Sequence, residues 1–290
     1  MIVLAPEVEA ALRDGTPVVA LETTLVAHGF PPGDGVAVGA ESERRVREAG
    51  AVPATIGVLD VAVRVGLSSE ELERFDARAR KVGPRDLAAC AAQGAVGATT
   101  VGGTLAVCRA AGIRFMGTGG LGGVHRGWEV GRLDVSADLA ELARTQVLVV
   151  SSGVKSLLDV AATAEALETL GVPVLGFRTD ELPLFYAARG GPPVSARVES
   201  AAEAAAIARA HWELGGGGLL LARPPDESLD DVEPLIEEAL ALAEERGVGG
   251  QDVTPFVLSF LHERSGGATL RANRDLVVAN AALAAEAAVA

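Results

Sequence analysis

One stretch near the N-terminus reads Pro17-Val18-Val19-Ala20-Leu21-Glu22. Its four consecutive apolar residues form a run that is too short for a helix and lacks the polar alternation of a half-buried strand. Such a run is typical of a parallel strand that is buried on both faces. Six further short apolar runs have the same character: Thr55–Leu59, Ala98–Val101, Ile113–Gly117, Gln146–Ser151, Val172–Phe177 and Gly218–Ala222.

Longer stretches with helical periodicity lie between or after these runs. Because strands that alternate with helices build a sheet covered on both faces, the sequence predicts a three-layer α/β/α fold with a largely buried central sheet. No linker or repeat divides the chain, so we predict a single domain over residues 1–290. The loop 178–197, which contains the only tyrosine, is predicted as a lid or a subunit contact. The predicted helices span Val36–Ala49, Ser68–Ala77, Pro84–Ala92, Leu105–Ala111, Ala137–Arg144, Lys155–Leu170, Ala201–Trp212, Val232–Glu245, Pro255–Glu263 and Asn273–Ala288.

The composition indicates a folded cytoplasmic protein. Of the 290 residues 49% are hydrophobic, which is enough for a large core. The 25 basic and 39 acidic residues give a net charge of −14, which argues against binding of nucleic acid or of an anionic membrane surface. The N-terminus shows no signal-peptide pattern, and no apolar run is long enough to span a membrane. Cys90 and Cys108 lie outside any metal-ligand spacing, so we interpret them as buried thiols in a reducing compartment.

Candidate chemistry is expected where strands end, because ligands of open α/β sheets bind beyond the carboxyl ends of the strands. Glu22 closes the first predicted strand. A carboxylate in that position is costly to ionise unless it has a partner, which raises its pKa and suits a general acid. Bonding of the carboxylate to loop amides explains the position equally well, and the sequence leaves both interpretations open.

A glycine-rich segment follows the strand Ile113–Gly117 and reads Thr118-Gly119-Gly120-Leu121-Gly122-Gly123-Val124-His125-Arg126-Gly127. Together with the glycine before it, the segment contains the pattern G-x-G-x-x-G. No helix is predicted to begin there, however, as a dinucleotide-binding fingerprint requires. The backbone amides of such a turn, with His125 and Arg126 beside them, form a cradle for an anion. A plain connecting loop is the alternative.

Two carboxylates come after this segment. Asp138, with Glu141 three residues later, fits a helix cap with its capping-box partner. Asp134 is not explained by that cap. One carboxylate cannot enclose a metal ion, but hard divalent ions often bind one or two carboxylates together with waters and substrate oxygens. Asp134 is therefore a candidate metal ligand.

Lysine is rare in this chain. Among the 25 basic residues only Lys81 and Lys155 are lysines. Lys155 follows the strand Gln146–Ser151 and is predicted to open a helix, where the helix dipole favours the neutral amine that can act as a nucleophile. The alternative is a solvated Lys155 that pairs with Asp159 one helical turn later. Lys81 either presents its ammonium group to a phosphate or is a solvated side chain.

Taken together, these segments resemble the pseudouridine-5′-phosphate glycosidase family, which is also described as indigoidine-synthase-A-like. The match runs from about residue 19 to residue 283, and nine segments in register carry the resemblance. They are the glycine-rich segment, Lys155-Ser156-Leu157-Leu158-Asp159, and residues 20–29, 50–56, 81–82, 97–101, 134–139, 179–183 and 254–256. Any one of them is a weak signal, and their common order makes the set specific.

The resemblance implies a homotrimeric lyase with an α/β/α core that reversibly cleaves the C–C glycosidic bond of pseudouridine 5′-phosphate, giving uracil and ribose 5-phosphate. It implies Lys155 as the nucleophile that forms an imine with the sugar and Glu22 as the proton donor. It places Asp134 on a Mn²⁺ ion, largely through waters. The substrate-binding residues that it implies are Lys81, Val101, Thr118, His125, Ser136, Ala137, Asp138 and Asn280.

Two other functions remain open at this point. One is a Schiff-base aldolase or lyase that acts on another sugar phosphate, and the other is a sugar-phosphate- or nucleotide-binding protein without catalysis. The presence of Glu22, Lys155 and Asp134 together favours an enzyme over a binding protein. In each case the expected partner is a small molecule, with no nucleic acid and no membrane involved.

Overall fold

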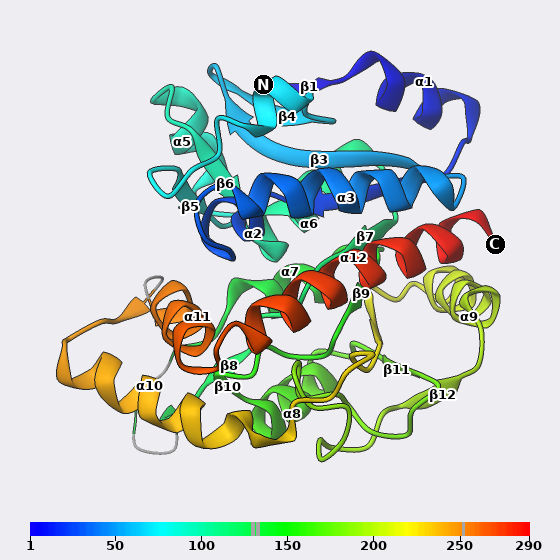
Figure 1. The fold of residues 1–290 in the computed structure, drawn as a ribbon. Coiled ribbons are helices and arrows are strands. Elements are labelled where there is room, and N and C mark those ends of the chain that lie inside the picture. Colours follow the sequence, from blue (N-terminus) through cyan, green and yellow to red (C-terminus); the bar gives the residue numbers. More distant parts are fainter. Residues whose placement is uncertain (129–130, 132–133, 251–252) are drawn as a thin grey trace.

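The computed structural model describes residues 1–128, 131, 134–250 and 253–290, and Figure 1 shows their arrangement. Within these residues, eleven strands form one mixed sheet. Nine of them follow one another side by side along a main path, and the other two form a branch, in which β6 pairs with β3 and β5 pairs with β6. The strands of the main path are, in order, β1 (Ile2–Leu4), β4 (Ala62–Val65), β3 (Val52–Leu59), β2 (Val18–Glu22), β7 (Phe115–Gly117), β9 (Leu148–Ser151), β13 (Leu219–Ala222), β11 (Val174–Phe177) and β12 (Ala196–Val198). The other strands are β5 (Arg80–Val82), β6 (Gly97–Thr99) and a separate antiparallel pair, β8 (Val124–His125) and β10 (Leu158–Asp159).

Helices occupy much of the remaining chain. They are α1 (Pro6–Asp14), α2 (Thr24–His28), α3 (Asp34–Glu48), α4 (Ser69–Leu72), α5 (Leu87–Ala92), α6 (Val101–Ala111), α7 (Ala137–Ala143), α8 (Val160–Thr169), α9 (Ala201–Glu213), the 3-10 helix η2 (Asp230–Val232), α10 (Glu233–Glu245), α11 (Val253–Arg264) and α12 (Ala268–Val289). In the described part of the chain, none of these helices combines the length and the apolar character needed to cross a membrane.

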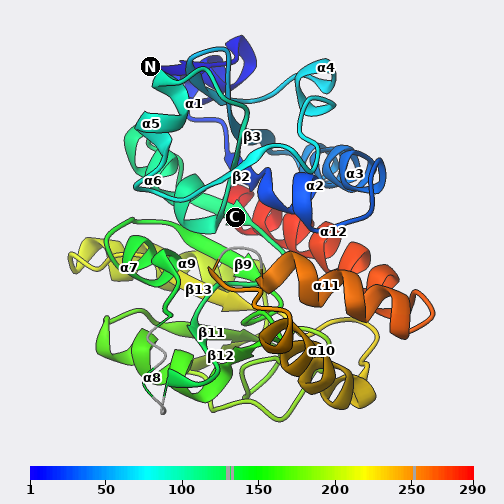
Figure 2. The ribbon, with the colours of Figure 1, turned by 90° about the vertical axis from the view of Figure 1, so that its left-hand side faces the viewer.

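The helices cover both faces of a mostly parallel sheet, which confirms the predicted three-layer α/β/α fold. Alternate residues of β2 show why both faces are apolar. Val18 and Ala20 pack into a cluster with residues of α6 and α7, whereas Val19 and Leu21 pack into a second cluster with residues of α3 and α12. Figure 2 shows α6 and α7 on one side of the sheet and α3 and α12 on the other. The short apolar runs therefore behave as strands buried on both faces.

All seven predicted strands are present, but β6 is shorter than the predicted run Ala98–Val101. It ends at Thr99 because the next residue, Thr100, caps α6. The Thr100 hydroxyl oxygen accepts a hydrogen bond of 3.1 Å from the Gly103 amide. Val101 is therefore the first residue of a helix rather than the last of a strand.

The predicted helix Pro84–Ala92 also begins later, at Leu87. A turn precedes it, in which the Asp86 amide donates to the Gly83 carbonyl at 3.0 Å and the Asp86 carboxylate accepts from the Gly83 amide at 3.2 Å. Because these hydrogen bonds fold residues 83–86 into a turn, the helix begins after Asp86, and the predicted position of Pro84 within the helix is wrong.

The elements that the sequence did not predict are mostly short. Strands β1, β5 and β12 have three residues each, and a run of that length shows no period. Helix α1 is longer and carried a readable signal. Pro6 is its first residue, and Gly15, with φ of 74°, follows its end, which is the usual placement of these two residue types.

The C-terminal helix α12 runs across the middle of the molecule in Figure 1 and contacts β2, β7 and β9. Small side chains permit this close approach. A Cβ atom on Gly117, the last residue of β7, would lie only 2.7 Å from the Cα atom of Ala281. Because Gly117 has no side chain and Ala281 has only a methyl group, α12 lies directly against the strand ends at which the candidate site is found.

Candidate active site

Three neighbouring parallel strands end at the site. β2 pairs with β7, and β7 pairs with β9, each in parallel register. Their carboxyl ends therefore lie side by side. Glu22 ends β2, Thr118 follows β7, and Lys155 lies on the loop after β9. The structure thus brings together polar residues that are up to 133 positions apart in the chain, from Glu22 to Lys155.

The Glu22 side chain is buried, with 4% of its surface exposed. The hydroxyl group of Thr118 donates a hydrogen bond to Glu22 Oε1, and among the described residues no backbone amide donates to this carboxyl group. Burial raises the pKa of Glu22, while the charge of Lys155 and the hydrogen bond from Thr118 act in the opposite direction. The negative charge of Asp138 raises this pKa further. A carboxyl group that keeps its proton at higher pH is suited to donate it.

Lys155 does not begin a helix, so the support expected from a helix dipole is wrong. The residue lies in an irregular segment between β9 and β10, and α8 begins only at Val160. The reason is Asp159, whose carboxylate caps α8 by accepting a hydrogen bond of 2.9 Å from the Ala162 amide. The same carboxylate accepts from Trp128 Nε1 at 3.0 Å, so it is engaged with groups other than the lysine.

Backbone contacts hold Lys155 in place instead. Its amide donates to the Leu121 carbonyl of the glycine-rich segment at 3.1 Å. Its own carbonyl accepts from the Leu158 amide at 3.0 Å, which closes a turn over residues 155–158. The half-buried side chain leaves this turn toward the carboxyl ends of the strands.

Two cavities meet at this lysine. One, here named the narrow cavity, has a volume of about 60 Å³, and the other, the wide cavity, has a volume of about 640 Å³. Lys81, Lys155 and Thr254 line both of them. The narrow cavity is also lined by Glu22, Thr24, Leu25, His28, Gly29, Gly119, Gly120, Ser156, Leu157, Phe185, Pro255, Leu258, Asn273 and Val277. The wide cavity is also lined by Gly83, Pro84, Arg85, Asp86, Thr100, Gly122, His125, Asp134, Val135, Ser136, Ala137, Asp138, Ala140, Glu141, Arg144, Leu158 and Gly250.

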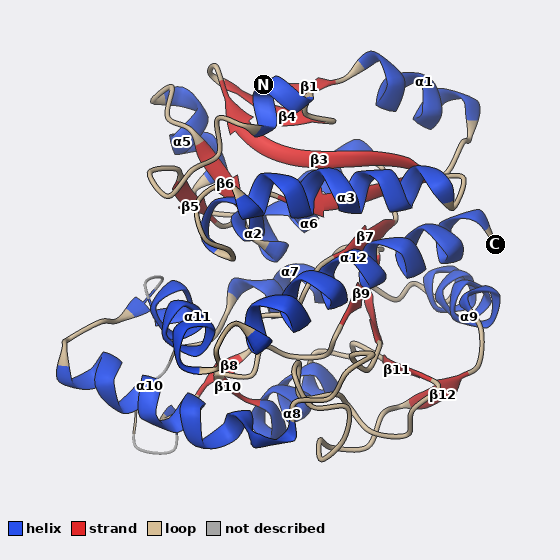
Figure 3. Ribbon diagram, in the orientation of Figure 1, coloured by secondary structure: helices blue, strands red, loops and turns tan. Residues whose placement is uncertain are grey.

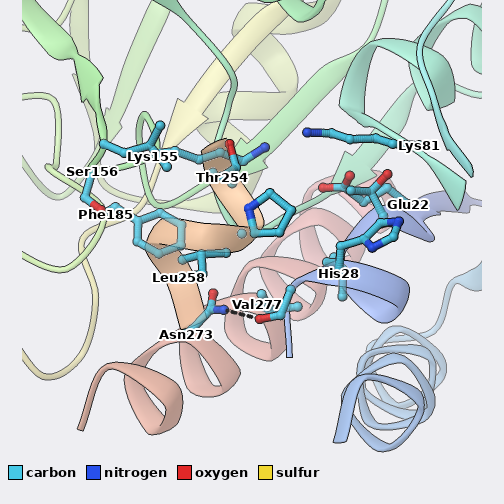
Figure 4. A pocket seen from close by; sticks show the side chains of 17 residues that line it. Glu22, His28, Lys81, Lys155, Ser156, Phe185, Thr254, Leu258, Asn273 and Val277 are labelled. Carbon is cyan, nitrogen blue, oxygen red and sulfur yellow. Dashed lines mark hydrogen bonds between the residues drawn. The ribbon is translucent and has the colours of Figure 1, made fainter. Parts of the chain in front are cut away.

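The two lysines of the chain face each other. In Figure 4 the ammonium groups of Lys81 and Lys155 point toward one another, and the charges of both lysines act on the Glu22 carboxyl group, that of Lys155 more strongly. Lys81 reaches this position from β5, which pairs with β6 opposite Ala98. The structure therefore places both lysines and the buried carboxyl group around one space, where an anionic substrate would be attracted to the two positive charges.

Asp138 has a different role from the predicted helix cap. Ser136 is the residue that caps α7, because its hydroxyl oxygen accepts a hydrogen bond from the Asp138 amide at 3.2 Å. The buried Asp138 carboxylate accepts from the Gly102 amide at 2.7 Å and from the Gly122 amide at 2.9 Å. A Cβ atom on Gly122 would lie 2.5 Å from Asp138 Oδ2, so this approach requires glycine. Glu141 is no capping-box partner, since it pairs with two arginines.

The glycine-rich segment consequently binds an anion that belongs to the chain itself. The amide of Gly122 is used by Asp138. Arg126, which was expected beside an external anion, bonds to backbone carbonyls and to Glu233 and lines neither the narrow nor the wide cavity. Binding of an external anion beside Arg126 stays a prediction, since this side chain lines a third cavity together with Ser156, Leu158 and Glu233. The segment contains β8 and no helix, in agreement with the rejection of a dinucleotide fingerprint.

His125 and Asp134 lie together on the wall of the wide cavity. His125 Nδ1 is 3.9 Å from Asp134 Oδ2, and the His125 amide donates to the Asp134 carbonyl at 2.9 Å. Burial lowers the pKa of His125, the charges of Lys81 and Lys155 lower it further, and the charge of Asp134 opposes them. The imidazole is therefore mostly neutral at pH 7 and can accept a proton or a hydrogen bond. The described residues contain no group of three or more His, Cys, Asp or Glu side chains arranged to hold a metal ion.

The other predicted substrate residues lie at or just behind the cavity walls. Ser136 and Ala137 line the wide cavity, whereas Val101 and Asn280 are fully buried and line neither cavity. The Asn280 side-chain amide donates to the Thr118 carbonyl at 2.8 Å and to Ser152 Oγ at 3.1 Å. Asn280 therefore joins α12 to the loops that follow β7 and β9. Direct contact of Val101, Thr118 or Asn280 with a substrate stays a prediction.

Sequence reasoning missed the apolar wall of the narrow cavity. Phe185 comes from the loop 178–197, and Pro255 and Leu258 come from α11. One signal was available, because Phe185 and Tyr186 are the only two adjacent aromatic residues in a chain with 3% aromatics. Phe185 also has a φ of 67°, an unusual backbone conformation for a residue other than glycine and one that clusters at functional sites.

The fold and the site define an α/β enzyme whose lysine and buried carboxyl group meet at the carboxyl edge of a parallel sheet. Comparison with known proteins identifies its family. The family model described as "Indigoidine synthase A like protein" matches residues 7–290, and this chain belongs to that family. The family membership inferred from the sequence motifs is thereby confirmed.

Two similar curated proteins carry the same name. A pseudouridine-5′-phosphate glycosidase of a Nocardioides species is 49% identical over 292 residues, which cover 98% of this chain and 95% of that protein. A pseudouridine-5′-phosphate glycosidase of Streptomyces griseus is 50% identical over 296 residues, which cover 99% and 91%.

Two solved structures share the fold. The prealnumycin C-glycosynthase in complex with ribulose 5-phosphate has a TM-score of 0.89 and 41% identity, and the match covers 100% of this chain and 97% of that one. An indigoidine synthase A-like protein of Thermotoga maritima has a TM-score of 0.89 and 39% identity, with 100% and 96% covered.

The buried carboxyl group makes stability depend on pH in a defined direction. The folded-state pKa of Glu22 lies above its ordinary value of 4.5, so the folded state binds this proton more tightly than the unfolded state does. The contribution of Glu22 to the free energy of unfolding therefore falls as the pH rises from 4.5 through the folded-state pKa. Glutamine cannot ionise and can still accept the hydrogen bond from Thr118. We expect the free energy of unfolding of Glu22→Gln, measured by urea unfolding, to rise relative to that of the wild type as the pH increases above 4.5.

Glu7→Gln is the control with the opposite sign. The hydrogen bond from Arg47 lowers the pKa of the half-exposed Glu7, so Glu7 contributes stability above its ordinary value of 4.5 and loses it below. The Glu7→Gln variant should therefore be less stable than the wild type at pH 7 and equal to it in acid. A difference between Glu22→Gln and the wild type that stays constant over this pH range would contradict the account of Glu22.

Proposed function

We propose that this protein reversibly cleaves the C–C glycosidic bond of pseudouridine 5′-phosphate, giving uracil and ribose 5-phosphate. The observation that carries the proposal is the meeting of Lys155 and the buried Glu22 on one cavity. The names of relatives that are about half identical over nearly the whole chain support the choice of reaction.

The bond to be broken explains why a lysine is needed. Ordinary glycosidases protonate a leaving heteroatom between two carboxyl groups. A C-nucleotide has no such atom, because C1′ of the ribose is joined to C5 of uracil. An imine between an amine and C1′ supplies an electron sink in its place. A guanidinium group stays charged and cannot form this imine, whereas the amine of Lys155 can.

The proposed reaction has three steps: opening of the ribose ring, cleavage of the C1′–C5 bond and hydrolysis of the imine. The neutral Lys155 amine attacks C1′, the bond from C1′ to the ring oxygen breaks, and Glu22 gives its proton to that oxygen. Glu22 recovers a proton from the attacking nitrogen. C5 of uracil then takes up a proton and becomes tetrahedral. The C1′–C5 bond breaks as the nitrogen lone pair forms the C=N bond, and the electron pair of the broken bond restores the C5=C6 double bond of uracil. Water hydrolyses the iminium group, which releases a proton, the aldehyde of ribose 5-phosphate and the free amine.

The wide cavity has the size and charge for the sugar phosphate. Its volume of about 640 Å³ lies within the range of small-molecule sites. Lys81 presents a positive charge to it, and Ser136 and the neutral His125 add polar groups on the same wall. We propose that the phosphate is held there and supplies binding energy that positions C1′ beside Lys155.

The narrow cavity fits the other end of the substrate. Leu25, Leu258, Val277 and the ring of Phe185 give it a mainly apolar wall. Uracil is a flat ring that binds well against an aromatic side chain. We propose that the released base lies here, next to Glu22 and Lys155.

Asp134 suits a hydrated divalent ion. Its carboxylate is half exposed, lies on the wide cavity and has His125 Nδ1 at 3.9 Å. Hard ions such as Mg²⁺ bind one or two carboxylates and keep several waters, and Mn²⁺ accepts the same oxygen ligands. We propose that Asp134 holds Mn²⁺ largely through waters. When bound, such an ion offsets negative charge on substrate oxygens.

Borohydride trapping tests the imine directly. Wild-type protein incubated with ribose 5-phosphate, Mn²⁺ and borohydride should form a reduced adduct on Lys155, located by mass spectrometry of its peptides. Lys155→Arg keeps the positive charge but cannot form the imine, so it should give no adduct and lower the rate of bond cleavage by about a thousandfold or more.

Lys81→Arg is the matched control, because Lys81 is the other lysine of the chain. It should still form the adduct on Lys155. An adduct on Lys81, or none with folded wild-type protein, contradicts the imine mechanism. Uracil distinguishes the remaining alternatives. It should accelerate consumption of ribose 5-phosphate and give the C-nucleotide, whereas an aldolase acting on another sugar phosphate would not respond, and a binding protein would consume nothing.

The metal site can be tested without an activity assay. Binding of Mn²⁺ to the protein, followed by electron paramagnetic resonance of the free ion, should weaken about tenfold or more in Asp134→Asn. Asp86→Asn removes another carboxylate from the wall of the wide cavity and should bind Mn²⁺ as the wild type does. Equal affinity of Asp134→Asn and the wild type would exclude Asp134 as the ligand.

The proposed place of uracil predicts a selective effect on one substrate. In the direction of synthesis, Phe185→Leu should raise the KM for uracil about 2- to 10-fold, the usual worth of an aromatic contact. The KM for ribose 5-phosphate should not change. Phe260→Leu, on α11 but outside both cavities, is the control. A rise in the KM for ribose 5-phosphate alone would place the base elsewhere.

A further inference from the structure

The turn that carries Lys155 is held by hydrogen bonds from Arg126, a residue that lines neither the narrow nor the wide cavity. Arg126 follows β8, which pairs with β10 at the end of this turn. Its Nη2 atom donates to the Ser156 carbonyl at 3.0 Å, and its Nε atom donates to the Leu158 carbonyl at 3.4 Å. These two carbonyls lie on either side of Leu157, so one guanidinium group spans most of the turn. The strands β8 and β10 are the two short red arrows near α8 and α10 in Figure 3.

The same guanidinium group also reaches α10. Its Nη1 atom donates to Glu233 Oε1 at 2.6 Å, and Glu233 is the first residue of that helix. Helix α10 packs against α11, which supplies Thr254, Pro255 and Leu258 to the narrow cavity. Arg126 therefore bonds both to the turn that carries Lys155 and to the helix that packs against α11, which forms one wall of the narrow cavity.

We infer that Arg126 is a positioning residue for the Lys155 amine. The inference rests on the proposed function, in which that amine attacks C1′. Arg126 lines neither the narrow nor the wide cavity, but a third one that Lys155 and Glu22 do not line, so in the proposed site it acts through the backbone of the turn and not through the substrate. Its planar group has five N–H donors and can serve two carbonyls and a carboxylate at the same time, which a lysine ammonium group in this position cannot match in geometry.

Loss of these bonds affects the rate more than the binding of substrate. Without Arg126 the carbonyls of Ser156 and Leu158 are free to turn toward water, and the segment between them can shift. A displacement of about 1 Å at a reacting group costs about 100-fold in rate. The phosphate and the base contact other parts of the proposed site, so their affinity should change little.

The test compares Arg126→Ala and Arg126→Lys with a matched control. Arg264→Ala also removes a half-exposed arginine that pairs with a carboxylate of α10, since Arg264 Nη2 is 3.2 Å from Glu238 Oε2, but it touches no part of the lysine turn. For each full-length protein with Mn²⁺, we would measure the thermal midpoint, kcat and KM for C-nucleotide formation. A single-turnover experiment would give the rate of the borohydride-trapped adduct at saturating ribose 5-phosphate.

We expect Arg126→Ala to lower kcat and the rate of adduct formation about 10- to 100-fold with KM changed by less than about twofold. Arg126→Lys should recover part of this loss, and Arg264→Ala should match the wild type. Glu233→Gln keeps both carbonyl bonds, so its loss should be smaller than that of Arg126→Ala.

Three results would overturn the inference: wild-type rates of adduct formation in folded Arg126 variants, an equal loss in Arg264→Ala, or a higher KM with unchanged kcat. If Arg126→Ala does not fold, Arg126→Lys is judged by the same criteria. Absence of any adduct in the wild type would instead show that the proposed function has failed, which keeps the two failures distinct.

Discussion

The parallel pairing of β2, β7 and β9 is the constraint on which the site depends, because it brings three separate loops to one edge of the sheet. The end of each strand, or the loop that follows it, then supplies one group: the Glu22 carboxyl, the Thr118 hydroxyl and the Lys155 amine. Helix α12 covers the same strand ends, and the side chain of Asn280 bonds to two of the loops at once. A carboxyl group placed there is cut off from water, and this burial is the main cause that raises the pKa of Glu22 and suits it to hold a proton.

The carboxylate of Asp138 links this geometry to the wide cavity. It binds amides from two loops, one at the start of α6 and one in the glycine-rich segment, and so fixes where both loops lie. Its negative charge also contributes to the raised pKa of Glu22. One buried anion therefore shapes the wall of the wide cavity and adjusts the proton affinity of a carboxyl group on the narrow cavity. Its internal hydrogen bonds account for its burial without any ligand.

The parts of this site that the sequence predicted are those that depend on local pattern. A buried strand and the polar residue at its end are neighbours in the chain, so Glu22 and the loop of Lys155 could be placed from the sequence. The role of Asp138 could not be, because its partners lie 36 and 16 residues away while a nearby acidic residue imitates a capping box. The helix expected at Lys155 fails for a related reason, since nothing local distinguishes Asp159 as a residue inside a helix from Asp159 as the cap of α8, which it is. Phe185 reaches the narrow cavity only through tertiary packing.

The distribution of cations follows from what each position must do. Arg126 has to bond two carbonyls and a carboxylate at once, which requires several donors in a fixed plane. Lys155, in the proposed mechanism, has to lose a proton and form a bond to carbon, which a guanidinium group cannot do. The chain otherwise uses arginine for its basic residues, and both of its lysines lie where two cavities meet. Exposed ion pairs contribute little to stability, so most of the chain's cations place few demands on the residue type, whereas the proposed function requires an amine at Lys155.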